Sequence, residues 1–201
     1  MDRSDRQLTM KHELFRHLEL ELFVQRGQLP DTLALVRDVL RSTARLTENV
    51  SPRVEGLLDA AGESREWTRL RGTYQHHYPI CVRRVSPDDT LISMASVVGR
   101  PEEDWYAVSL ITYCTPRDPF YRVAHLLARV VHGQLGGRIH WGKWFPLDGS
   151  QVAESYPALA TFRACCRRAD PAGVFRNAFV ERTLFEGGAE ASPQSGHTAP
   201  A

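Results

Sequence analysis

The sequence has no long apolar run and almost no net charge, and each absence excludes a class of protein. No stretch approaches the roughly 20 consecutive apolar residues of a membrane-spanning helix. The formal net charge is +1 and the basic residues are scattered, so we expect neither nucleic acid nor a membrane as a partner. The N-terminus, MDRSDRQLTMKHE, is polar and unlike a secretory signal, which favours a cytoplasmic protein.

The four cysteines lack the spacing of a zinc site. Cys81 and Cys114 stand alone, whereas Cys165 and Cys166 are adjacent and cannot easily bridge each other. Free thiols and no metal site are therefore expected. A glycine-rich loop of the kind that cradles a phosphate or dinucleotide is also missing.

What remains is an ordinary globular composition, with 42% apolar and 24% charged residues in a chain of 201. Residues 12–24, HELFRHLELELFV, alternate between leucines on one face and glutamates such as Glu19 and Glu21 on the other. This period of two predicts a half-buried strand. Further strands are expected at 76–85, 90–96, 105–114 and 138–144, and the short links between the first three favour antiparallel pairing.

Helices are predicted between these strands from periodicity and end signals. Asp31 precedes a segment with a 3.6-residue period, and Asp118-Pro119 opens a helix that Gly136-Gly137 ends. One short helix is expected within 47–66 and another helix over 150–168. The order of elements predicts an α+β fold, an antiparallel sheet with helices packed on one face. This domain should cover 12–185, between a flexible N-terminus at 1–11 and a disordered polar tail at 186–201.

Five segments of the chain, in order and spacing, resemble the C-terminal part of the sugar-lactone and alditol oxidases. These are flavoenzymes of the vanillyl-alcohol-oxidase type, among them L-gulonolactone oxidase and D-arabinono-1,4-lactone oxidase. The matching segments are YPICVRRV (78–85), LITYCTPRDP (110–119), GGRIHWGKWF (136–145), YPALATF (156–162) and DPAGVFRNAFV (170–180).

The resemblance implies a substrate (cap) domain of the lactone-oxidase type, whose sheet covers the flavin ring. The FAD-binding domain that comes first in the family has no counterpart in these residues. The chain alone is therefore expected to bind no cofactor, and FAD only together with a partner. A separate FAD-domain protein or a second copy of the chain, giving an oligomer, would cover the exposed face.

The same resemblance implies roles for two cations. Lys143 matches the lysine that lies by the flavin and substrate, where a cation stabilises negative charge on the reduced flavin or a developing alkoxide. Arg83 matches an arginine whose planar fork suits a substrate oxygen, so it is a candidate for catalysis and for substrate binding. The alternatives are a surface lysine beside packed tryptophans and a structural salt bridge.

Cys81 is where the sequence departs from the family, which has glutamate two residues before this arginine. A thiol takes a proton from a hydroxyl only if its pKa is depressed, which nearby Arg83 and Lys143 would favour. The alternative is a small buried apolar residue. Thr112 falls near a polar residue with which alditol oxidases contact substrate, and His140 is a further candidate, the alternative being a packed, hydrogen-bonded histidine. Cys81, Arg83, Thr112 and Lys143 are expected to share one cavity.

These observations leave three functions open. The chain is the substrate-domain half of a flavin-dependent sugar-lactone or polyol oxidase, with a small hydroxylated molecule as substrate and a separate FAD-domain partner. Alternatively, it is a cofactor-free descendant that binds a small secondary metabolite or transforms it by proton transfer, cyclisation or hydrolysis. The third alternative is a decayed copy without activity.

Overall fold

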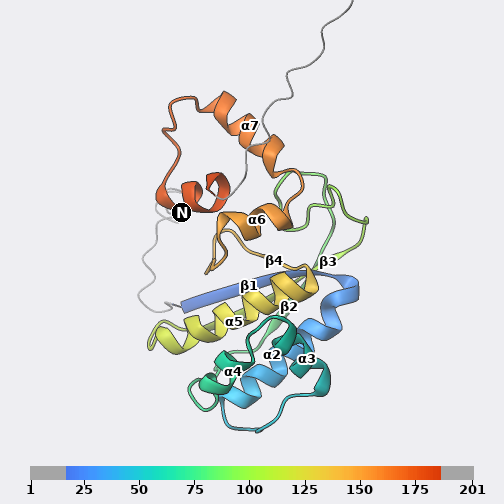
Figure 1. Cartoon of the computed structure of the whole chain (residues 1–201), viewed down its shortest axis with the longest axis vertical. Helices are drawn as coiled ribbons and strands as arrows, with labels where there is room; N and C mark the ends of the chain where they lie inside the picture. Colours follow the sequence, from blue (N-terminus) through green and yellow to red (C-terminus); the bar gives the residue numbers. More distant parts are fainter. Residues whose placement is uncertain (1–16, 187–201) are drawn as a thin grey trace, which may run out of the picture. The chain divides into compact units, whose positions relative to one another are not determined.

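A computed structural model describes residues 17–186 (Figure 1). The expected flexible N-terminus at 1–11 lies outside the described residues, as does the expected disordered tail apart from Glu186. The chain divides into two compact units, one ending at Pro146 and the other starting at Leu147. The first unit contains the sheet, and the described part of the second is helical.

The sheet is antiparallel, with strand order β2-β3-β1-β4. β1 (His17–Gln25) pairs with β3 (Trp105–Tyr113) along its whole length. β2 (Cys81–Val85) pairs with the other edge of β3, and the short β4 (Arg138–Ile139) pairs with β1. The predicted α+β fold with an antiparallel sheet is confirmed.

Helices cover one face of this sheet (Figure 1). α2 (Leu29–Thr43) and α5 (Asp118–Leu135) contact β1, while α3 (Pro52–Ala60) and α4 (Ser64–Leu70) contact α5. The short 3-10 helix η1 (Arg26–Gln28) leads from β1 into α2. The leucines of β1 that were predicted to share one face point toward these helices, and Leu20, Leu22 and Val24 are fully buried.

The long helix α5 follows from its sequence signals. Proline occupies its first turn, and Gly136 ends it with φ of 59°, a left-handed conformation that favours glycine. Its buried stripe contains the predicted Phe120, Val123, Leu127 and Val130. The prediction of this helix from periodicity and end signals is therefore confirmed.

The predicted strand at 90–96 is wrong, and Arg138 supplies the physical reason. Its Nη1 donates to the carbonyl oxygens of Ser93, Met94 and Ser96 at 3.3, 3.3 and 2.7 Å. Its guanidinium lies 4.6 Å from the centroid of the Trp105 ring. Carbonyl groups that converge on one buried cation are not arranged for a strand ladder, so residues 90–96 wrap around Arg138 instead.

Four other predicted elements differ in extent. The region 47–66 holds α3 and the start of α4, separated at Gly62, whose φ is 70°. The strands expected at 76–85 and 138–144 shrink to β2 and β4. The helix expected over 150–168 is two helices, α6 (Gly149–Ser155) and α7 (Leu159–Ala169), because Pro157 forces Tyr156 into an extended conformation.

The second unit also contains α8 (Ala178–Val180) and the π-helix η2 (Glu181–Phe185), which contacts α6 and α7. Asp148 caps α6 by accepting hydrogen bonds from the backbone of Ser150 and Gln151. Across residues 17–186, every helix is too short or too polar to cross a membrane.

Replacement of Arg138 by methionine should destabilise the protein by roughly 2–4 kcal/mol, because the carbonyl oxygens of 93–96 lose a charged donor. Arg122→Met is the matched control, since Arg122 is half-exposed and pairs with the partly exposed Glu66. The control should cost less than about 1 kcal/mol. Urea unfolding of both variants gives the two values, and equal costs would show that the Arg138 contacts do not hold this segment.

Candidate functional site

The face of the sheet opposite the helices carries a cluster of polar residues at one end. β1 brings Glu19 and Glu21 to this face, because alternate residues of a strand point the same way. The register places Ser109 opposite Glu21, and Cys81 opposite Ser109 on the next strand. We call this region the polar face. It consists of residues from β1, β2 and β3 and two residues from the loop after β4: Glu19, Glu21, Cys81, Arg83, Ser109, His140 and Lys143.

Glu21 is the buried centre of the polar face, with 1% of its surface exposed. Its Oε1 accepts hydrogen bonds from Arg83 Nη2 and, at 2.9 Å, from Ser109 Oγ. Its Oε2 lies 3.8 Å from Nε2 of His140. A buried carboxylate is tolerated when cations and hydrogen-bond donors surround it, and here each oxygen faces a partner.

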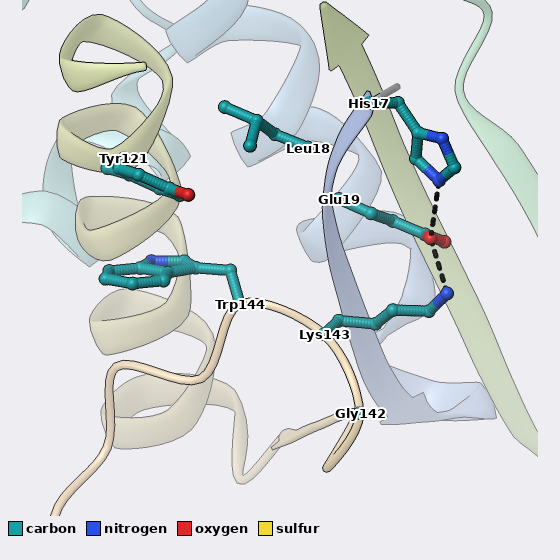
Figure 2. Close-up of a pocket in the computed structure, with 7 residues that line it drawn as sticks. All are labelled: His17, Leu18, Glu19, Tyr121, Gly142, Lys143 and Trp144. Carbon is teal, nitrogen blue, oxygen red and sulfur yellow. Dashed lines mark ion pairs between the residues drawn. The ribbon is translucent and has the colours of Figure 1, made fainter. Parts of the chain in front are cut away.

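Glu19 forms a second ion pair beside the first. Its Oε2 lies 2.6 Å from Lys143 Nζ and 3.6 Å from Nε2 of His17, and Figure 2 shows these groups on the side of β1 away from Leu18 and α5. The backbone of Trp144 donates to the Glu19 carbonyl at 3.0 Å, which fixes the loop that carries Lys143 along the edge of β1. Lys143 and Arg83 thus each pair with a glutamate on the same face of β1.

An open pocket of about 380 Å³ adjoins this second pair (Figure 2). Its aromatic wall consists of Tyr121 and Trp144, whose rings stack at 4.2 Å between centroids. The remaining lining residues are His17, Leu18, Glu19, Gly142 and Lys143. The stacked rings lie on the α5 side of β1, and the charged ends of Glu19 and Lys143 point to the other side (Figure 2).

His140 is held on both sides of its ring. The backbone N–H of Gly142 donates to Nδ1 at 3.0 Å, so in the neutral ring Nε2 carries the proton and faces Glu21. The backbone N–H of His140 also donates to the Glu21 carbonyl at 3.0 Å. This is the packed, hydrogen-bonded histidine weighed above, and a substrate contact through His140 stays a prediction.

Cys81 lies at the start of β2 and is exposed. The alternative of a small buried apolar residue is therefore wrong. It shares the polar face with Arg83, two residues further along the strand, whose side chain is 65% exposed. The Cys81 thiol and the Arg83 guanidinium are therefore both exposed on this face of the sheet.

Thr112 does not join this group, which corrects the expectation of a shared cavity. It is three residues from Ser109 on β3, so it points to the helix-covered face, where only 2% of it is exposed. There it forms a side-chain hydrogen bond with Tyr74. Burial raises the pKa of Tyr74, and the bond to Thr112 offsets part of that rise. The hydroxyl of Tyr74 lies 2.8 Å from Nδ1 of His76, and burial, aided by His77, lowers the pKa of that histidine.

Sequence reasoning missed Glu19, Glu21 and Ser109 as site residues. The alternation in β1 placed both glutamates on a face assumed to be solvated, yet Glu21 is buried. The available signal was Phe23, an aromatic residue on the same face two positions later, which shows that the glutamate face is also covered. Ser109 carried no signal of its own, because its role depends on the strand register.

The described residues 17–186 contain no group of three or more histidine, cysteine or acidic side chains arranged to hold a metal ion. The chemistry that the polar face offers is instead that of paired cations and carboxylates. Such groups bind and orient hydroxyl oxygens and stabilise negative charge.

Comparison with known proteins identifies the family of this chain. The sequence model of D-arabinono-1,4-lactone oxidase matches residues 1–183. A long-chain alcohol oxidase from an uncultured marine euryarchaeote is 42% identical over 185 residues, covering 91% of this chain and 38% of the relative. The chain therefore belongs to the D-arabinono-1,4-lactone oxidase family, whose oxidases are flavin-dependent.

Two further relatives have related activities. The alditol oxidase of Streptomyces sp. (strain IKD472 / FERM P-14339) is 31% identical over 70% of this chain and 31% of its own length. The L-gulonolactone oxidase of Bos taurus is 30% identical over 54% of this chain and 24% of its own length. The chain thus spans well under half the length of the curated relatives it matches.

Thr112→Val tests the separation of Thr112 from the polar face. Valine keeps the shape but loses the hydroxyl bond to Tyr74, so we expect a cost of about 1 kcal/mol in unfolding free energy. Chemical shifts of Arg83 and Lys143 should not change, because they lie on the other face of the sheet. Shifts of both cations in the variant's NMR spectrum would contradict the placement.

Proposed function

We propose that this chain forms the substrate-facing part of a flavin-dependent oxidase, and that the substrate lies on the polar face. The observation that carries the proposal is the pair of cations, Arg83 and Lys143, each held by a glutamate on the same side of β1. The two glutamates are two residues apart, which places them roughly 7 Å from each other. One small molecule can therefore contact both cations.

The charges of this site fit a flavin. Lys143 and Arg83 have side chains that are 32% and 65% exposed, so both cations are accessible to a group outside the sheet. A bound flavin supplies the hydride acceptor for alcohol oxidation. The contribution of Lys143 is to hold positive charge where negative charge develops, and that of Arg83 is to orient a substrate oxygen with its remaining N–H donors.

The charge balance of the polar face favours a neutral substrate. Arg83 is paired with Glu21 and Lys143 with Glu19, so each cation has a carboxylate partner. An anionic substrate would have to compete with two carboxylates, whereas hydroxyl groups bind both partners of each pair. A sugar lactone, polyol or other alcohol meets this condition, in line with the names of the relatives.

Cys81 is our candidate for the group that takes the hydroxyl proton. It is exposed, and it occupies the position two residues before Arg83. A thiolate is the form of cysteine that accepts a proton. Glu21 is too deeply buried for direct contact with a substrate.

The flavin, in this proposal, is carried by a flavin-binding domain outside residues 1–201 that docks over the polar face in the cytoplasm. A separate protein supplies this domain, and a second copy of the chain is the competing occupant of the face. One observation favours a second function, the cofactor-free descendant: Cys81 stands where the resembled oxidases have glutamate. Such a protein would bind a hydroxylated metabolite on the same face without oxidising it.

Absorption spectroscopy distinguishes these functions. The purified chain, alone or with added FAD, should lack stoichiometric flavin absorbance. The chain should then be assembled with the part of the euryarchaeote relative that it does not match, loaded with FAD. This assembly should oxidise an alcohol, polyol or lactone and reduce oxygen. Lys143→Met should lower turnover at least about 100-fold, because a cation at developing charge is lost.

The control is Arg122→Met, which removes a cation from the exposed surface of α5 and should leave turnover unchanged. A chain that purifies with one flavin per molecule would contradict the proposed division of labour. An assembly that binds hydroxylated ligands but never reduces its flavin would support the cofactor-free function instead.

A further inference from the structure

The position of Arg83 does not by itself fix the orientation of its side chain. It lies on β2, an edge strand of the described sheet, and 65% of its side chain is exposed. An arginine in such a place samples many rotamers, and each one aims its donors differently. Orientation of a substrate oxygen requires one of these arrangements to be held.

Glu21 can hold the Arg83 guanidinium in one arrangement, because Glu21 is itself fixed in place. β1 is a central strand that pairs with β3 on one side and β4 on the other, so the backbone of Glu21 is fixed. Its side chain is fixed in turn by Ser109 Oγ at 2.9 Å from Oε1 and by the His140 ring opposite Oε2. The glutamate and the arginine come from strands separated by β3, and the Arg83 Nη2 bond to Oε1 spans that strand.

We propose that Glu21 is a positioning residue: it fixes the guanidinium of Arg83 through Nη2 so that the remaining N–H donors face the substrate. This inference rests on the proposed function of the polar face. Glu21 is not a catalytic residue, because it is 1% exposed and its oxygens already face Arg83, Ser109 and His140. Its effect on the substrate passes through Arg83.

The chain contains a matched control for this pair. The neighbouring Arg84 is 66% exposed and also donates to a carboxylate, with Nε and Nη2 at 2.8 and 3.0 Å from the oxygens of Asp104. As the next residue on β2, Arg84 points to the opposite face from Arg83. Glu21→Gln and Asp104→Asn each remove the negative charge that pairs with an exposed arginine. The first arginine lies on the polar face and the second lies outside it.

NMR of the isolated chain tests the positioning without any cofactor. In the wild type, restricted rotation of the guanidinium should give Arg83 resolved Nη signals, and these should persist in Asp104→Asn. In Glu21→Gln they should merge, because the guanidinium loses its ion pair with a carboxylate and keeps only a neutral acceptor. Unchanged Arg83 signals in folded Glu21→Gln, or mobile Arg83 signals in the wild type, would overturn the proposal.

A double-mutant cycle on the assembled oxidase adds a reading that a structural role would not give. Glu21→Gln should lower kcat/KM at least about tenfold, and Arg83→Ala should lower it further. In the Arg83→Ala background, Glu21→Gln should have no additional effect on kcat/KM, since its action passes through the missing arginine. Additive losses would overturn the proposal.

Ser109→Ala serves if Glu21→Gln does not fold, because it frees Glu21 while leaving the ion pair in place. It should broaden the Arg83 signals and lower kcat/KM in the same direction, and no change in either would count against the proposal. A wild-type assembly without oxidase activity would instead refute the proposed function, whereas the NMR result concerns Glu21 and Arg83 alone.

Discussion

The polar face depends on one constraint, the burial of the Glu21 carboxylate. A buried negative charge is costly unless donors and a cation surround it. Arg83, Ser109 and His140 meet this requirement from β2, β3 and the loop after β4, so a single side chain draws three separate segments of the chain together. A second ion pair, between Glu19 and Lys143, lies two residues away along β1. In the proposed function, a hydroxylated molecule binds at these two ion pairs.

The same face of the sheet is apolar at its other end. Phe23, Trp105 and Ala107 are buried there with Ala95, from the segment that wraps around Arg138. The segment that Arg138 holds therefore covers one half of the face. The half with Arg83 and Lys143 stays accessible. This division explains why the face that carries the proposed site is polar only near Glu19 and Glu21.

Local signals in the sequence predicted the fold class and the long helix correctly, because proline, glycine and hydrophobic period act within a few residues. They failed at 90–96, where three carbonyl groups bind Arg138 from more than 40 residues away. The family resemblance pointed to Arg83 and Lys143, which do share a face. It also pointed to Thr112, which strand alternation turns away from them, and it was silent on Glu21, whose burial appears only when the strands pair.

In the proposed oxidase, the flavin-binding part covers the polar face. Cys81 reports on this face directly, since it is exposed and adjacent to Arg83. The decisive measurement is the rate of Cys81 alkylation, read by mass spectrometry, in the isolated chain and in the assembled oxidase, with Cys114 as the internal reference. We predict that assembly slows the alkylation of Cys81 at least about tenfold, as expected for a thiol removed from solvent. Equal rates in the isolated and assembled states would contradict the account.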